Sequence, residues 1–215
     1  MDIVLISDPR VAAIEVRECG EALAPVRGRL RLDERMASAS GAYSFLRAGL
    51  LGRLERAERR LPAGFHLLIV EGYREIAVQQ EIFDSYSDTL RRTYPDMSPD
   101  DLYAAASRYV SPVPVAPHTA GAAVDLTLCA DDGTEYDMGT AVNDTPEESA
   151  GACFTASPDI SGEARSHRKI LGAALEGVGL VNYPTEWWHW SYGDRYWAYT
   201  TGASHAVYGP TSIVA

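Results

Sequence analysis

A glutamate and a histidine lie three residues apart in the aromatic run Glu186-Trp187-Trp188-His189-Trp190. These side-chain types suit a metal site with its own base, because a metal ion that activates water needs about three protein ligands, an open position and a nearby carboxylate that is not a ligand. His189 would then be a ligand and Glu186 the base. The alternative interpretation is an aromatic core cluster that contains the two polar residues by chance.

A second nitrogen ligand and an oxygen ligand occur in the segment 117–125, which contains His118 and Asp125. Seven residues span roughly 23 Å when extended and roughly 10 Å as a helix, too far for two side chains that share one ion. The chain must therefore bend between them, and Gly121 can adopt the backbone angles that such a bend requires. Together with His189 and the free Glu186, these residues make up the side-chain set of a catalytic zinc hydrolase.

The elements around these residues must place them in one cavity. Alternating polarity over 124–128 predicts a half-buried strand, in which the Asp125 carboxylate needs a metal or another cation as its partner. Glu186 and His189 can share a cavity only if the chain turns near Glu186, because residues three apart on a straight strand face opposite sides. A short strand over 180–183 followed by Pro184 and Thr185 permits such a turn.

A charged turn follows the most apolar segment of the chain. Residues 65–70 are almost continuously apolar and predict a central strand, and a helix is expected over 75–93. The buried face of that helix is expected to carry Ile82, Tyr86 and Leu90. Arg74 lies between the two elements, where it can reach a cleft. The simpler interpretation of Arg74 is a surface salt bridge.

Further elements are expected around this framework. They are a helix from Ser40 to about Arg60 with the apolar stripe Leu46, Leu50, Leu54, Ala57 and Leu61, a helix from Ser98 to about Tyr109, extended chain over 111–117, a hairpin turn over 131–134 with a return strand, a polar loop over 143–161 and a helix over 162–176. His66 is expected to be packed or hydrogen-bonded in its strand. His167 is expected at the surface or in helix packing, so neither histidine is assigned as a ligand.

The composition limits the class of protein. The chain has 215 residues, of which 46% are hydrophobic, so one core and a single domain over residues 1–215 are expected. A formal charge of −11 and a pI near 4.9 argue against nucleic-acid and membrane partners and favour small solutes. The sequence shows neither a basic leader nor a transmembrane run, which predicts a cytoplasmic protein. Three widely spaced cysteines, Cys19, Cys129 and Cys153, predict reduced structural thiols.

The combined pattern resembles the D-alanyl-D-alanine dipeptidase family of zinc enzymes. The matching residues are Gly72-Tyr73-Arg74, His118 with Gly121, Ala123 and Asp125, Asp137-Met138-Gly139-Thr140, and Glu186-Trp187-Trp188-His189. The resemblance extends from about Phe65 to Tyr192. It implies an α+β fold in which a small, mostly antiparallel central sheet carries the zinc site and helices flank the sheet.

The resemblance also implies the chemistry of the site. The three ligands of Zn²⁺ would be His118, Asp125 and His189. Zinc would lower the pKa of its water, Glu186 would accept the proton and later protonate the leaving amine, and Arg74 would face the oxyanion. Glu71 would hold Arg74 in place.

Two positions bear on the substrate. Asp137 matches the family position that receives the substrate ammonium group. Ala116 stands where family members usually have serine, two residues before the first histidine, and the missing hydroxyl predicts looser selectivity for D-alanyl-D-alanine.

The expected function is zinc-dependent hydrolysis of D-alanyl-D-alanine or similar small dipeptides. Residues 111–117 and 143–161 are candidate walls of a cavity that excludes longer peptides. A D,D-carboxypeptidase or a peptidoglycan endopeptidase would share the zinc site but need an open groove. A non-catalytic zinc-binding module would need neither Glu186 nor Arg74. The sequence leaves open the oligomeric state and the physiological role, whether glycopeptide antibiotic resistance, cell-wall recycling or a specialised pathway.

Overall fold

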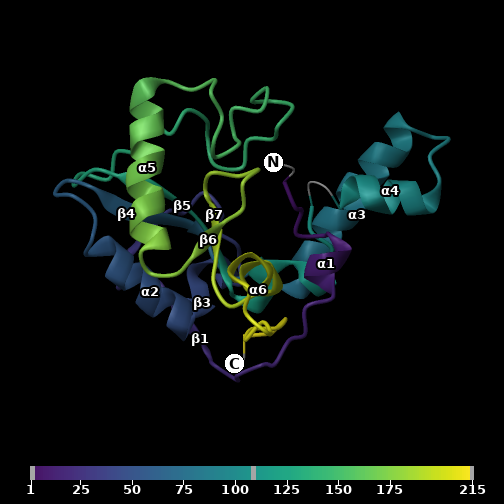
Figure 1. Ribbon diagram of the computed structural model, residues 1–215, viewed down its shortest axis with the longest axis horizontal. Helices are drawn as coiled ribbons and strands as arrows, with labels where there is room; N and C mark the ends of the chain where they lie inside the picture. The colour runs from purple at the N-terminus through teal and green to yellow at the C-terminus, as the bar shows by residue number, and fades with distance from the viewer. Residues whose placement is uncertain (1–2, 108–109, 214–215) are drawn as a thin grey trace.

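The computed structural model describes residues 3–107 and 110–213, and a five-stranded mixed sheet lies at its centre (Figure 1). In sheet order the strands are β2 (Arg31–Leu32), β4 (His66–Glu71), β5 (Ala123–Cys129), β7 (His189–Ser191) and β6 (Val181–Asn182). β2 pairs with β4 in parallel, and the other pairings are antiparallel. The predicted α+β fold with a mostly antiparallel central sheet is confirmed.

Helices and a second small sheet surround the central sheet. The helices are α1 (Pro9–Ala12), α2 (Ala48–Glu58), α3 (Ile76–Thr93), α4 (Pro99–Ala106), α5 (Gly162–Glu176) and α6 (Arg195–Thr201). Strands β1 (Leu23–Pro25) and β3 (Phe45–Arg47) form the second sheet, and short 3₁₀ turns span Ala42–Ser44, Val113–Val115 and Pro117–Ala120. Within the described ranges, no helix is both long enough and apolar enough to cross a membrane.

The main hydrophobic core lies between the sheet and helices α2 and α5. Alternate residues of the two central strands point into it, because successive side chains of a strand face opposite sides. The core includes Leu67 and Ile69 of β4, Leu126 and Leu128 of β5, Leu50, Leu54 and Ala57 of α2, and Leu171 and Leu175 of α5. In Figure 1, α2 and α5 lie at the left, and α3 and α4 extend at the right. The opposite face of the sheet carries the polar side chains of Asp125 on β5 and His189 on β7.

A register shift near the end of β4 changes which side chains face the polar side of the sheet. Ile69 pairs with Leu126 of β5. The next pair is Glu71 with Asp125, which leaves Val70 between them as an extra residue. Because one extra residue reverses the direction of the side chains that follow it, Glu71 faces the same side as Asp125 and not the core.

The helix expected from Ser40 to about Arg60 begins later than predicted. Helix α2 begins at Ala48, and Leu46 belongs to strand β3, where it pairs with Ala24 of β1. The hydroxyl of Ser40 donates to Glu75 instead of capping the helix. The strand pairing between distant segments therefore overrides the helical spacing of the leucines. The buried stripe on the rest of the helix is as predicted.

The helix expected over 75–93 is present as α3, but its predicted buried face is wrong. Its buried residues are Gln79, Phe83 and Ser87, and Ile82 is 38% exposed. The helix packs against α4 and the turn Val113–Val115, and the buried Gln79 side chain bonds Arg74 and the Ser111 carbonyl. A prediction from the hydrophobic residues alone therefore assigns the wrong face of α3 to the protein interior.

Strand 124–128 is present as β5, but all its residues are buried and not only alternate ones. β5 lies between β4 and β7 in the sheet, so it has no exposed edge. The prediction of extended chain up to His118 is also wrong, because Val113–Val115 and Pro117–Ala120 form 3₁₀ turns. The return strand after the hairpin turn is reduced to a single bridge between Cys129 and Glu135.

Two helix predictions depend on local signals. The hydroxyl of Ser98 accepts from the Asp101 backbone N–H and caps α4, as predicted. Helix α4 ends at Ala106, and the predicted end near Tyr109 lies outside the described residues. Helix α5 begins after Ser161, which caps it, and has the predicted bounds. Both starts depend on a side chain and a backbone group three residues apart, which the sequence shows directly.

Candidate metal centre and active site

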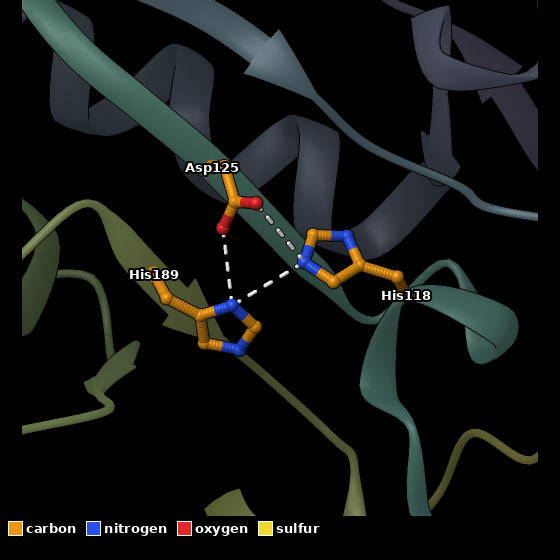
Figure 2. A group of neighbouring side chains, drawn as sticks. All are labelled: His118, Asp125 and His189. Atoms are coloured by element: carbon orange, nitrogen blue, oxygen red, sulfur yellow. Dashed lines mark hydrogen bonds and ion pairs between the residues drawn. The ribbon is translucent and has the colours of Figure 1, made fainter. Parts of the chain in front are cut away.

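Three side chains from separate segments form one buried cluster (Figure 2). His118 lies in the 3₁₀ turn Pro117–Ala120, Asp125 on β5 and His189 on β7. One potential ligand atom of each residue lies within 4.8 Å of the other two, and no residue of the cluster is more than 5% exposed. The structure therefore brings together the three residues predicted as metal ligands.

Strand register and one glycine place the three side chains. Asp125 pairs directly with His189 across β5 and β7, so their side chains are neighbours on one face of the sheet. Gly121 has a φ of +62°, which a residue with a Cβ resists, and it turns the chain between His118 and Asp125. A Cβ at this position would also collide with the side chain of Leu23. The predicted bend at Gly121 is confirmed.

The ring orientation of each histidine leaves a nitrogen for a metal ion. Nδ1 of His118 donates to the Gly72 carbonyl at 2.7 Å, so its Nε2 carries the lone pair. That Nε2 lies 3.3 Å from Nδ1 of His189 and 3.4 Å from Oδ2 of Asp125. Nδ1 of His189 lies 3.0 Å from Oδ1 of Asp125. Converging nitrogen and carboxylate donors of this kind fit zinc.

The charges within the cluster favour an ionised carboxylate. Burial alone would raise the pKa of Asp125, but the charges and hydrogen bonds of His118 and His189 lower it below its usual value. Burial alone would lower the pKa of His189, but the hydrogen bond with Asp125 and nearby negative charges raise it. In the metal-free protein a proton therefore competes with a metal ion for His189, which weakens metal binding at low pH.

Glu186 lies beside the cluster without being part of it. Its Oε2 is 3.7 Å from Nδ1 of His189, and its side chain is 29% exposed towards the cavity. Its backbone N–H donates to the Tyr183 carbonyl at 2.9 Å, which forms the predicted turn before β7. Burial raises the pKa of Glu186, although the charge of His189 opposes this effect. A carboxylate with a raised pKa next to the metal position suits proton transfer.

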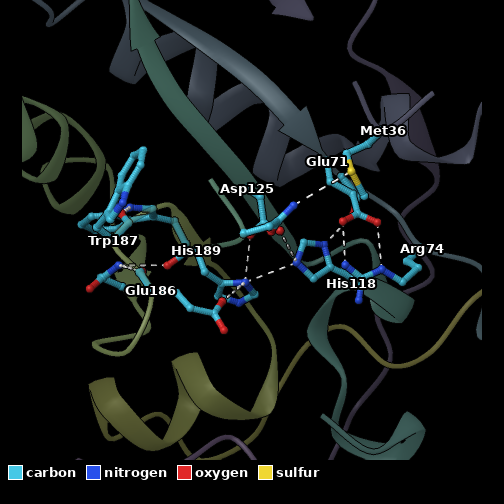
Figure 3. A network of polar contacts seen from close by, with 12 residues as sticks. Met36, Glu71, Arg74, His118, Asp125, Glu186, Trp187 and His189 are labelled. Atoms are coloured by element: carbon cyan, nitrogen blue, oxygen red, sulfur yellow. Dashed lines mark hydrogen bonds and ion pairs between the residues drawn. The ribbon is translucent and has the colours of Figure 1, made fainter. Parts of the chain in front are cut away.

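Arg74 lies on the other side of the cluster from Glu186 (Figure 3). Its Nε and Nη2 donate to the two carboxylate oxygens of Glu71 at 2.8 and 2.6 Å. Burial alone would lower the pKa of Arg74, but the ion pair with Glu71 and further negative charges raise it. Arg74 is only 17% exposed and lines the cavity, so the surface salt-bridge interpretation is wrong.

Gln79 of α3 is a residue of the site that the sequence interpretation missed. It is 2% exposed, and its Oε1 accepts from Nη1 of Arg74 at 2.8 Å. Its Nε2 donates to the Ser111 carbonyl at 2.8 Å, which joins Arg74 to the segment 111–117. The only sequence signal was the four-residue spacing of Gln79, Phe83 and Ser87 on one helical face.

A cavity of about 470 Å³ lies in front of the cluster, within the usual size range of small-molecule sites. The predicted walls 111–117 and 143–161 both contribute, through Ser111, Ala116 and Asn143 among others. Leu5 and Ile6 of the N-terminal segment also line the cavity, which was not expected. Segments from several distant parts of the chain therefore line the cavity.

Asp137 is not among the residues that line this cavity, and its contact with the substrate ammonium group stays a prediction. Its side chain is exposed, and its carboxylate accepts from the Gly139 N–H at 2.7 Å and from the Ser161 hydroxyl at 3.4 Å. These bonds close a turn before α5 and hold the carboxylate away from the cluster. On the loop that follows, Asp144 lines the cavity instead.

The two other histidines discussed above lie outside the cluster, as expected. His66 is hydrogen-bonded to Glu58 and Asp131, each at 2.8 Å. His167 is buried, and its Nδ1 donates to the Asp137 carbonyl at 2.7 Å. Both rings therefore serve the packing of the fold.

Comparison with known proteins connects this geometry to a family. Residues 51–206 match the D-ala-D-ala dipeptidase family, a span that includes every residue of the cluster. A D-alanyl-D-alanine dipeptidase of Synechocystis sp. is 29% identical over 223 aligned residues, which cover 90% of each protein. A D-alanyl-D-alanine dipeptidase of Escherichia coli is 28% identical over 128 residues, which cover 59% of this chain and 55% of that protein.

Similar solved structures include the LdcB LD-carboxypeptidase and VanYB. The LdcB LD-carboxypeptidase has a TM-score of 0.46 and 17% identity, with 86% of this chain and 73% of that chain covered. VanYB in complex with D-alanine-D-alanine has a TM-score of 0.37 and 18% identity, with 94% and 92% covered. Structural similarity at these TM-scores does not support a family assignment, which depends instead on the sequence match. Because that match spans most of the chain, the protein belongs to the D-alanyl-D-alanine dipeptidase family of metallopeptidases.

Proposed function

We propose that this protein uses zinc to hydrolyse D-alanyl-D-alanine or similarly small dipeptides. The observation that supports the proposal is a buried His-Asp-His cluster flanked by Glu186 and Arg74 in one cavity. The residues that would hold the ion are His118, Asp125 and His189. When bound, zinc would polarise the peptide carbonyl and lower the pKa of a water molecule to about 7.

The chain's own groups then handle the proton and the developing charge. Glu186 takes the proton of the attacking water and returns it to the leaving amine, and its raised pKa suits both transfers. Arg74 donates to the oxygen that becomes negative. Three of its five N–H groups are engaged by Glu71 and Gln79, so two are left for this oxygen.

The substrate ammonium group needs a carboxylate that the chemistry does not already use. Among the described residues, three carboxylates line the cavity, those of Asp125, Glu186 and Asp144. The first belongs to the metal cluster and the second is the base. We therefore propose Asp144, as the alternative to Asp137, for the ammonium group.

A substrate panel tests the proposed function. Zinc-loaded protein is incubated with D,D-, L,D- and L,L-dipeptides and with a pentapeptide that ends in D-alanyl-D-alanine. We expect hydrolysis of the D,D-dipeptide and none of the pentapeptide, because residues of both predicted walls line the cavity. Efficient cleavage of the pentapeptide would assign a D,D-carboxypeptidase instead. Absence of all hydrolysis would favour a non-catalytic zinc-binding module.

The wider role of the protein follows from this proposal. Hydrolysis of D-alanyl-D-alanine would belong to cell-wall metabolism, either in wall recycling or in resistance to glycopeptide antibiotics. The single domain over residues 1–215 and the cytoplasmic location stay predictions.

Arg74→Ala is expected to lower kcat by about 100- to 1000-fold, the usual effect of losing one oxyanion donor. Steady-state hydrolysis and thermal unfolding of the same preparations measure it. Arg10→Ala is the matched control, because Arg10 pairs with Asp8 on the surface and does not line the cavity. A loss of stability without a loss of kcat would leave Arg74 a structural role only.

Ala116→Ser is expected to shift the ratio of kcat/KM values several-fold towards D-alanyl-D-alanine, which corresponds to about 1 kcal/mol for one neutral hydrogen bond. Ala116 is 4% exposed and lines the cavity, so a hydroxyl there meets the substrate. The dipeptide panel measures both proteins. Ala120→Ser is the control, since Ala120 is equally buried but does not line the cavity. Unchanged ratios in Ala116→Ser would place the selectivity elsewhere in the cavity.

A further inference from the structure

Two buried polar atoms close to the metal cluster have no hydrogen-bond partner among the described residues. They are Nε2 of His189 and Oδ2 of Asp194. The two residues are 4% and 3% exposed, so bulk water does not reach them. Buried polar groups in proteins are almost always hydrogen-bonded, and each exception needs an explanation.

Strand β7 and the start of α6 place both atoms on the same side of the sheet. His189 and Ser191 are two residues apart on β7, so their side chains share one face. The Ser191 hydroxyl donates to Oδ1 of Asp194 at 2.9 Å, and the Trp197 backbone N–H donates to the same oxygen at 2.9 Å. Oδ1 is therefore fixed by two donors, and Oδ2 has none.

Aromatic packing also connects the start of α6 with His189. The ring of Tyr183 meets His189 edge-on at 5.9 Å between centroids and meets Tyr196 in the same way at 5.3 Å. Tyr196 belongs to α6, two residues after Asp194. The Tyr183 ring therefore contacts both His189 and the first turn of α6, which begins directly after Asp194.

The two histidines of the cluster present opposite ring nitrogens to the metal position. His118 presents Nε2 and donates Nδ1–H to the Gly72 carbonyl. A metal ion bound at Nδ1 of His189 requires the ring hydrogen to lie on Nε2, which then needs an acceptor. Histidines that bind metals almost always donate their other N–H to a carboxylate, a carbonyl or a water. Oδ2 of Asp194 is a buried carboxylate oxygen that has no hydrogen-bond partner among the described residues.

We propose that Asp194 is a positioning residue for His189. Its Oδ2 accepts the Nε2–H hydrogen bond through one ordered water, and so favours the tautomer whose Nδ1 lone pair faces the metal. This inference rests on the proposed zinc site. Partners of this kind typically contribute about 10- to 100-fold to metal affinity.

Asp194→Asn tests the proposal with little change of shape. The amide oxygen must accept from the Trp197 N–H, so the amide NH₂ points at Nε2 of His189 and opposes the required tautomer. We expect zinc affinity, measured by chelator competition, to fall about 10- to 100-fold. Nitrogen NMR of the metal-free protein at low pH, where His189 carries both ring protons, is expected to show that Asp194→Asn loses the hydrogen-bonded Nε2–H signal of His189. Asp194→Ser serves as the second variant, because serine still caps α6 but has no second oxygen.

Asp8→Asn is the matched control, because Asp8 caps α1 in the same way and lies outside the cavity. The inference would be overturned if both Asp194 variants kept a zinc affinity within threefold of wild type and an unchanged Nε2–H signal of His189. A wild-type protein that binds no zinc would refute the proposed metal site instead. In that case the NMR measurement on the metal-free protein would still decide whether Asp194 holds Nε2–H of His189.

Discussion

Glu186→Gln is expected to keep one zinc ion per chain while hydrolysis of D-alanyl-D-alanine falls by about 100- to 10,000-fold. Glu186 lies outside the ligand cluster, so its loss does not remove a ligand. An amide has the size of the carboxylate but cannot accept the proton of the attacking water. Elemental analysis and steady-state kinetics on one preparation measure the two effects.

The pH dependence of the wild-type enzyme provides a second test of the same group. Glu186 must be deprotonated to act as a base, so kcat/KM rises with pH through its pKa. Burial raises that pKa, which moves the acid limb above the range of an exposed glutamate. Glu186→Gln is expected to lose this limb, whereas Glu147→Gln, on the exposed part of the loop, keeps it. Near-normal turnover of Glu186→Gln would mean that another group takes the proton.

Replacement of any one ligand by alanine is expected to abolish both zinc binding and hydrolysis. The variants are His118→Ala, Asp125→Ala and His189→Ala. Each leaves only two donors in a site that needs about three protein ligands. Metal content by elemental analysis after dialysis is the measurement, and circular dichroism shows whether the variant is folded.

His66→Ala is the matched control for the ligand variants, because His66 bonds only Glu58 and Asp131 on a part of β4 distant from the cluster. It is expected to keep its zinc and its activity. A full zinc complement in folded His118→Ala would contradict the assignment of the ligands.

Much of the site was predictable because its signals are local. Donor types at His118, Asp125 and His189 indicate a metal whatever the fold, and Gly121 marks a bend that the spacing requires. The bounds of α5 and the start of α4 follow from capping serines three residues from the groups they bond. The turn at Glu186 follows from the alternation rule for strands.

Other features depend on contacts between distant segments, which a sequence pattern does not contain. Leu46 lies in a strand and not a helix because it pairs with β1, and α3 buries Gln79 because Arg74 and Ser111 bond it. Asp137 matched a motif, yet its bonds to Gly139 and Ser161 hold it outside the cavity.

By itself, the sequence determined the residue types of the site: the two histidines and the aspartate of the cluster, the carboxylate of Glu186, the cation of Arg74 and the turns next to them. Only the tertiary structure decided the direction in which several side chains point. The extra residue Val70 in β4 turns Glu71 away from the core and towards Asp125 and Arg74. The start of α6 places Asp194 on the His189 face of β7. Register and packing set these directions, and a shift of one residue reverses them, because side chains alternate along a strand.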